Sequence, residues 1–165
     1  TLKEKLPKEV KVGDLIENLD GYPELLVKNC KISNNRARGL LISNPKRTVI
    51  EDNFFNTEME AILIPVESGY WFESGNAANV IIRNNVFQDC QHGGHNRGII
   101  RLVTDEDNRN IAFKNIEISN NTFNQFDNLI LEVSKYAPAK VIFNYSPSLP
   151  IRIPLEKEEI LEMRE

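Results

Sequence analysis

The sequence predicts an all-β chain that folds as a right-handed parallel β-helix of about four to five rungs. Three observations lead to this prediction. The first two are that a strand-like segment ending in an asparagine-rich bend recurs along the chain and that a second β-rich strand follows every bend. The third observation is that the repeats are unevenly spaced. A coiled sheet accepts this, because a loop on one side can lengthen while the strands stay in register.

The first strand of each repeat carries apolar residues at its third and eighth places and Asn or Asp at its fifth. Period-two alternation indicates a strand with one face inward, and the polar residues that follow it suit the left-handed corner of a tight turn. The matching segments are LLVKNCKI at 25–32, TVIEDNFF at 48–55, VIIRNNVF at 80–87 and IEISNNTF at 116–123.

The second strand lets each unit return to its start. The eighth places of successive repeats are 23, 32 and 36 residues apart. None of the connections has the helical pattern of about 10 to 15 residues that a βαβ unit would need. A fifth, degraded rung is expected from Lys140 to Tyr145, before Pro147 and Pro150 break the pattern. The second strands are RGLLIS at 38–43, AILIPV at 61–66, RGIIRLV at 97–103 and NLILEV at 128–133.

Stacking of the rungs explains the recurring asparagines and phenylalanines. An Asn at the same bend of successive coils can hydrogen-bond to the Asn above and below it, as in the ladders of stacked sheets. We therefore interpret two sets of residues as structural and not as catalytic. They are Asn53, Asn85 and Asn121 in a ladder, and Phe55, Phe87 and Phe123 in an internal stack.

The chain divides into a lead-in segment at 1–24, β-helix rungs at 25–153 and an acidic tail at 154–165. The lead-in is expected to hold a short strand and loops, and the tail could form a short helix that begins at Pro154. No apolar run is long enough to span a membrane. Cys30 and Cys90 are too few for a disulfide framework, and we expect both to be buried and reduced.

Composition and motifs exclude several classes of function. The net charge of −4 provides no basic stripe, so nucleic acid is not an expected partner. There is no GxSxG motif, Walker loop or dinucleotide fingerprint, which argues against serine-hydrolase and nucleotide chemistry. No cofactor is expected.

Three stretches of the chain carry a resemblance to a known family: NNRARGLLIS at 34–43, GYWFESG at 69–75 followed by NVIIRNNVF, and NRNIAFKNIEISNNTFNQFDNLILEV at 108–133. Together with the lead-in GDLIENLDGYPELLVKNC, they resemble the later rungs of glycoside hydrolase family 110. That resemblance implies a right-handed parallel β-helix, exo-acting α-galactosidase activity on galactose-terminated glycans, and a secreted or periplasmic location. The family's catalytic carboxylates are expected on earlier rungs around an acidic pair, and no adjacent Asp-Asp pair occurs in this chain.

Glycoside hydrolysis uses two carboxyl groups, and the catalytic pair is unknown from this sequence. The acidic candidates outside the ladder include Glu58, Glu60 and Glu67, but Glu73 is the one singled out, as a weak candidate. Tyr70, Trp71 and Phe72 beside it could form a platform for the apolar face of a sugar ring. The alternative is that Trp71 caps the edge of the core and Glu73 pairs with Arg83.

Other candidate substrate contacts are Arg36, Arg38 and His92. The arginines precede a strand and could hold sugar hydroxyls, although ion pairing with a neighbouring rung is the favoured interpretation. Two histidines three residues apart on a loop are a poor metal signal, and no metal site is predicted. The acidic run at 104–108 leaves calcium binding at Asp105 to Asp107 open.

Three functions therefore compete. The chain is a carbohydrate-cleft portion of an α-galactosidase, itself inactive; a non-catalytic glycan-binding or structural β-helix; or, as a weaker alternative, part of a polysaccharide lyase. If the loop of Trp71 and Glu73 belongs to a cleft, it should lie on the same side of the coil as Arg36 and His92. The oligomeric state is not predicted.

Overall fold

The structure is a computed structural model of the 165-residue chain. It describes residues 3–14, 16–67, 69–72, 75–104, 112–125 and 129–133, together with the backbone of 141–144 and 161–164. Within these residues the chain winds into a coil whose strands form three sheets, and every strand pairing is parallel.

The sheets take one strand from each turn of the coil, so neighbours in a sheet are always distant in sequence. The first sheet has the order β1 (Leu25–Lys28), β4 (Thr48–Glu51), β7 (Ala77–Arg83), β10 (Phe113–Ser119), β13 (Val141–Asn144) and β14 (Leu161–Arg164). The second has the order β2 (Lys31–Asn35), β5 (Phe54–Thr57), β8 (Val86–Gln88) and β11 (Thr122–Asn124). The third has the order β3 (Leu40–Leu41), β6 (Ile62–Val66), β9 (Ile100–Thr104) and β12 (Leu131–Val133).

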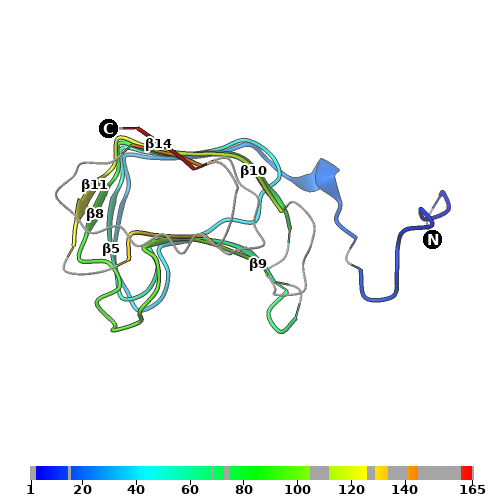
Figure 1. Cartoon of the computed structure of the whole chain (residues 1–165), viewed down its shortest axis with the longest axis horizontal. Helices are drawn as coiled ribbons and strands as arrows, with labels where there is room; N and C mark the ends of the chain where they lie inside the picture. The colour runs from blue at the N-terminus through cyan, green and yellow to red at the C-terminus, as the bar shows by residue number, and fades with distance from the viewer. Residues whose placement is uncertain are drawn as a thin grey trace.

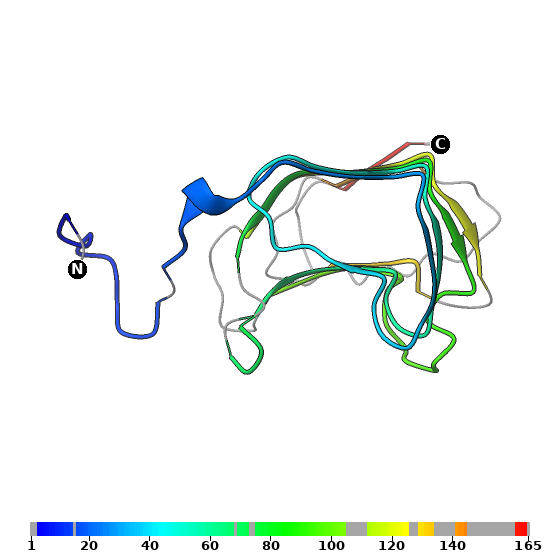
Figure 2. The same ribbon diagram turned by 180° about the vertical axis from the view of Figure 1, so that it is seen from behind.

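Figure 1 looks along the coil, so that the strands of each sheet lie behind one another. The sheet with β10 and β14 is at the top, the sheet with β5, β8 and β11 at the left, and the sheet with β9 below. Figure 2 shows the same three walls from behind, with the N-terminal segment leading away from the coil. This arrangement confirms the predicted parallel β-helix, including the degraded fifth rung, because β13 pairs with β10.

The registers place the predicted core residues in columns. Ile50 pairs with Ile82, and Ile82 pairs with Ile118; all three are at most 1% exposed. The phenyl ring of Phe87 stacks on those of Phe55 and Phe123, with centroid separations of 5.0 and 4.9 Å. Both predicted columns are therefore confirmed. Side chains from all three sheets fill the space between the walls, among them Ile62, Ile64, Val80, Ile100, Leu102, Phe113, Ile116 and Leu131.

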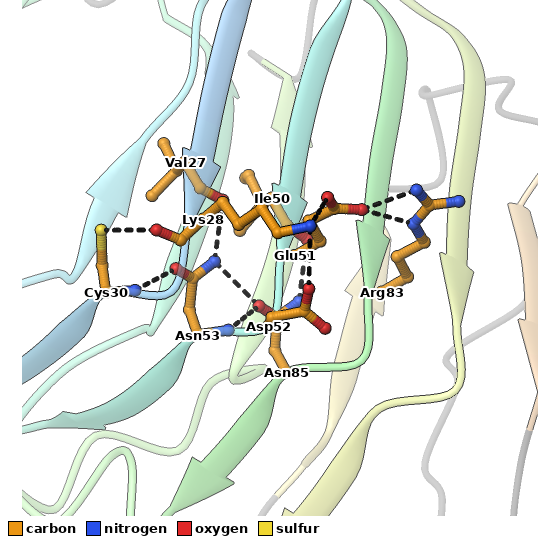
Figure 3. A network of polar contacts seen from close by, with 9 residues as sticks. All are labelled: Val27, Lys28, Cys30, Ile50, Glu51, Asp52, Asn53, Arg83 and Asn85. Atoms are coloured by element: carbon orange, nitrogen blue, oxygen red, sulfur yellow. Dashed lines mark hydrogen bonds and ion pairs between the residues drawn. The ribbon is translucent and has the colours of Figure 1, made fainter.

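The asparagine ladder is present at the bend between the first and second sheets (Figure 3). The Asn85 Oδ1 atom accepts from both the backbone N–H and the side-chain amide of Asn53, each at 3.0 Å. Asn121 Oδ1 does the same for Asn85, at 2.9 and 3.0 Å. Asn53 and Asn85 are buried, whereas Asn121 is half-buried. At the preceding place of each bend stands a residue with φ between 53° and 57°, and these residues are Asn29, Asp52, Asn84 and Asn120.

An ion-pair row crosses the outer face of the first sheet in the same view (Figure 3). Glu51 accepts from Lys28 Nζ at 2.7 Å and from the Arg83 guanidinium at 2.6 and 2.8 Å. Hydrogen bonds from Lys28 and then Arg83 lower the pKa of the Glu51 carboxyl, and the bond to Glu51 raises the pKa of Lys28. Arg83 thus has Glu51 as an ion-pair partner, while Glu73 lies outside the described residues.

Two expectations about the ends of the chain differ from the structure. Among residues 3–14 and 16–24 the regular element is the 3₁₀ turn η1 (Leu19–Gly21), and no strand is found there. In the tail, Leu161–Arg164 form β14 instead of part of a helix, while residues 154–160, where that helix was expected to begin, lie outside the described residues. The physical reason is that β13 would otherwise present unpaired backbone groups at a sheet edge, and β14 pairs with them. Within the described part of the chain, no helix is long and apolar enough to cross a membrane.

The two cysteines differ in exposure. Cys90 is a buried free thiol, as expected, and its burial raises its pKa. Cys30 is exposed, contrary to expectation. It occupies the ladder place of the first described rung, where its N–H donates to Asn53 Oδ1 at 2.9 Å, and no described strand covers it on the other side.

Candidate functional site

The loop between β6 and β7 presents an aromatic surface. The Glu67 carboxylate accepts the backbone N–H groups of Tyr70 and Trp71 at 2.6 and 2.9 Å, which holds the loop in a turn. The Tyr70 and Trp71 rings meet edge to face with centroids 4.8 Å apart. Their exposed fractions are 80% and 70%, and that of Phe72 is 67%. Trp71 therefore does not cap the core, and the loop displays three rings to solvent.

A groove of about 700 Å³ lies between this loop and the lead-in segment. From the loop it is lined by Phe72, Gly75 and Asn76. From the lead-in, Tyr22 donates a hydrogen bond from its hydroxyl to Glu17 at 2.5 Å. That bond, with lesser contributions from burial and from the Glu17 charge, raises the pKa of Tyr22. The groove thus joins carboxylate, phenol and amide groups to an apolar ring, a combination suited to a sugar.

Gly75 determines how closely the two sides of the groove approach. Its φ of 133° lies in a region that L side chains rarely adopt, and a Cβ added there would meet Glu17 Oε1 at 2.4 Å. A larger residue at position 75 would displace the Glu17 carboxylate. The lead-in, although it does not join a sheet, is therefore fitted to the loop that carries the aromatic rings.

The predicted site residues do not come together in one place. Tyr70 and Trp71 lie on the connection from the third sheet to the first, whereas Arg36, Arg38 and His92 lie on connections from the second sheet to the third. In Figure 1 these connections leave the coil at opposite corners, near β9 on one side and below β5 on the other. The expectation that they share one side was wrong, because loops of successive turns align only when they join the same pair of sheets.

Each residue of the second group has its own environment. Arg38 contacts Glu60 of the neighbouring rung with Nε at 3.7 Å from Oε2, as the ion-pair interpretation predicted. Arg36 is exposed. The ring of His92 is exposed, and its Nδ1 atom lies 2.8 Å from the Asp89 carbonyl oxygen within its own turn. Glu73 and Asp105 to Asp107 lie outside the described residues, so their proposed roles stay predictions.

Sequence reasoning missed a second polar cluster, which surrounds Glu60 at the corner between the second and third sheets. Arg97 and Arg101 also contact the Glu60 carboxylate, and Glu132 contacts Arg101. The register in the structure shows the relation that the sequence alone does not: Leu40 pairs with Ile62, so Arg38 and Glu60 stand at the same place of successive rungs. Among the residues whose positions are described, no three His, Cys, Asp or Glu side chains gather in a way that would hold a metal ion.

Comparison with known proteins agrees with this architecture. Residues 18–144 match the family model described as "Right handed beta helix region". The chain belongs to the right-handed β-helix family. The match covers the strands from β1 to β13, and it assigns to the coil the right-handedness that the sequence predicted.

Within this β-helix family the chain is similar to several α-1,3-galactosidases. It is 35% identical over 156 residues to Alpha-1,3-galactosidase B of Akkermansia muciniphila, a match that covers 87% of this chain and 20% of the relative. It is 37% identical over 132 residues to Alpha-1,3-galactosidase B of Bacteroides thetaiotaomicron, covering 76% of this chain and 22% of the relative. The resemblance to glycoside hydrolase family 110 is confirmed by these matches, in which the chain spans about a fifth of the length of its curated relatives.

Proposed function

We propose that this chain is the β-helix portion of an exo-acting α-galactosidase that hydrolyses terminal α-linked galactose. One observation carries the proposal: proteins named as α-1,3-galactosidases are 35% to 37% identical to the chain over three quarters or more of its length. We also propose that the whole protein is secreted or periplasmic and that galactose-terminated glycans are its partners.

The part assigned to this chain is substrate contact and not bond cleavage. Hydrolysis needs an acid and a second carboxyl group about 5 to 9.5 Å away across the scissile bond. We assign that pair to residues outside this chain. The exposed rings of Tyr70 and Trp71 and the groove beside them support a contact with the apolar face of a pyranose ring.

Binding can be measured directly, because Trp71 is the only tryptophan of the chain. We expect a saturable change in tryptophan fluorescence on titration with an α-galactosyl disaccharide, and no change with an α-glucosyl disaccharide. Tyr70→Ala should weaken binding roughly tenfold through the loss of one ring contact. Phe54→Leu, on the second sheet, is the matched control and should leave affinity unchanged.

The same preparation should release no galactose from a synthetic α-galactoside. Galactose release by the 165-residue chain would show that the catalytic pair lies within it and would contradict this division of roles. A fluorescence signal that responds equally to both disaccharides, or to neither, would remove the groove from the substrate site.

A further inference from the structure

Glu60 is a buried carboxylate surrounded by arginines. Its side chain is 0% exposed, and it stands just before β6 in the wall between two neighbouring rungs. Arg38 from the preceding rung lies 3.7 Å away, and Arg97 and Arg101 from the following rung lie at 3.5 and 3.7 Å. One carboxylate thus gathers three guanidinium groups from two other turns of the coil.

These contacts differ from those of the ion pair on the first sheet. Arg83 donates two hydrogen bonds of 2.6 and 2.8 Å to Glu51, and both end at the same carboxylate oxygen. Neither oxygen of Glu60 has a hydrogen-bond partner among the described residues, and the same is true of Arg38 Nε. Glu60 therefore neutralises its arginines from ion-pair distances of 3.5 to 3.7 Å without a hydrogen bond to any of them.

The three arginines differ in their exposure and in the number of carboxylates that they contact. Arg101 is 21% exposed, and its Nε atom lies 3.0 Å from Glu132. Arg38 and Arg97 are 31% and 44% exposed, and Glu60 is the only ion-pair partner that either has among the described residues. Three guanidiniums face two carboxylates, so the cluster carries a surplus of one positive charge. Planar guanidinium donors beside a net positive charge are suited to a carboxylate or sulfate group.

Two glycines give the cluster its close packing. A Cβ at Gly39 would meet the Ala61 carbonyl oxygen at 2.6 Å, and one at Gly98 would meet Glu132 Cβ at 2.6 Å. The Gly98 N–H also donates to Glu132 Oε2 at 2.9 Å, which fixes the carboxylate that holds Arg101. The backbone thus positions one arginine through Glu132 and presents the other two at the surface.

We propose that Arg38 and Arg97, which contact the two oxygens of the same Glu60 carboxylate, bind an anionic group on a glycan, either the carboxylate or the sulfate of an acidic sugar. The anionic group follows from the arginines, whereas the sugar that carries it rests on the proposed function. This site lies at the opposite corner of the coil from the groove beside Trp71. The two sites therefore contact different parts of a glycan, or different branches of it.

The test is a titration of the 165-residue chain, followed through the Nε–Hε resonances of its arginines. The probes are methyl glucuronide, a sulfated galactose, neutral methyl galactoside and inorganic sulfate. We expect both acidic sugars to shift the Arg38 and Arg97 signals with saturation and to leave the Arg83 signal in place. Neutral galactoside should not shift them, and inorganic sulfate should bind more weakly than the sulfated sugar.

Two variants of equal charge sharpen the result. Arg97→Gln should weaken binding of the acidic sugars on the order of tenfold, as expected for one charge-assisted hydrogen bond. Arg83→Gln removes the same charge from the first sheet and should change affinity less than about twofold, because exposed charges farther away than the Debye length are screened. The resonance shifts of the unchanged chain provide a second readout that does not depend on how a variant folds.

Absence of any shift at Arg38 and Arg97 would overturn the proposal, as would equal weakening by Arg97→Gln and Arg83→Gln. If inorganic sulfate bound as tightly as sulfated galactose, the claim that the anionic group is carried by a sugar would be contradicted. The proposed function is tested separately, since it is measured with neutral disaccharides and Trp71 fluorescence.

Discussion

At the scale of single residues, asparagine has two different roles at adjacent places of the same bend. At the first place the backbone adopts positive φ, as at Asn84 with 55°, which asparagine tolerates better than most residues. At the second place the amide of Asn85 bonds to Ile50, Asn53 and Asn121. Both roles were predictable from sequence, because each depends on residue type at a repeated position.

The ladder predicts a clear stability effect for Asn85→Ala. The substitution leaves the backbone N–H of Asn53 and the carbonyl of Ile50 without their buried partner, so we expect a loss of about 1 to 3 kcal/mol in the free energy of unfolding. Chemical denaturation measures it. Asn124→Ala, at an exposed place of β11, is the control and should change stability little. Equal stability of the two variants would show that the ladder contributes nothing.

Glu51 predicts a dependence of stability on pH. Because Lys28 and Arg83 lower the pKa of Glu51 in the folded chain, its contribution is present above the unfolded pKa of about 4 to 4.5 and is lost as pH falls through the folded value. Glu51→Gln should therefore be less stable than the parent at neutral pH and approach it in acid. Urea midpoints across this range test the prediction. Glu9→Gln, which removes an exposed carboxyl in the lead-in, is the control and should follow the parent at every pH. If the stability of Glu51→Gln also ran parallel to that of the parent across this pH range, the prediction would be contradicted.

Residue environments that depend on neighbouring rungs were harder to predict. Cys30 occupies a place in the repeat that is buried at Asn53 and Asn85 and half-buried at Asn121, yet it is exposed because it belongs to the first described rung. Glu60 looks like any acidic loop residue in the sequence. Its burial among arginines depends on the packing of Arg97 and Arg101 from the next rung, and the unequal loop lengths hide that match.

At the scale of elements, the strands of the repeat were predictable and the segments outside it were not. The strands carry alternation and a phenylalanine at a fixed place, and their registers follow from aligning those places. The tail instead has a weak apolar stripe that suits a helix and a strand equally well. Residues 161–164 form a strand because they pair with the edge of β13. This edge arises from the tertiary fold, so the sequence of the tail does not indicate it.

The phenylalanine stack should be the most sensitive element of the coil. Phe87 is fully buried between Phe55 and Phe123, so Phe87→Ala would open a cavity and remove contacts with both rings. We expect a loss of about 3 to 5 kcal/mol in stability, measured by thermal or chemical denaturation. Phe54→Ala, at a half-buried place in the same sheet, should lose clearly less. A smaller loss for Phe87→Ala than for Phe54→Ala would contradict the stacked core.

At the scale of the whole molecule, the coil determines which loops can cooperate. From the sequence, Trp71 was expected on the same side of the coil as Arg36 and His92, because inserted loops of successive turns were expected to project in one direction. The three-sheet geometry separates Trp71 from the other two, because every turn has corners that face different directions. The fold was therefore predictable from the repeats. To predict which candidate site residues lie together, one would also have to know which pair of sheets each loop connects.

Among the strands that the structure describes, β1 stands at an unpaired edge of the first sheet, and this predicts self-association of the 165-residue chain. Leu25 and Asn29 donate their N–H groups toward the next rung, so the N–H of Leu26 faces the open side. The Leu26 side chain is 62% exposed beside it. An uncovered apolar edge is a template for pairing with another chain.

We therefore expect the sedimentation coefficient of the chain to rise with its concentration, and Leu26→Pro to reduce that rise. Proline removes the outward N–H without breaking a bond to β4, so the urea midpoint should remain close to that of the parent. Leu26→Lys keeps the N–H but adds a charge to the edge, and it should reduce association as well. A chain that stays monomeric at all concentrations, or variants that associate as the parent does, would show that pairing does not occur through β1.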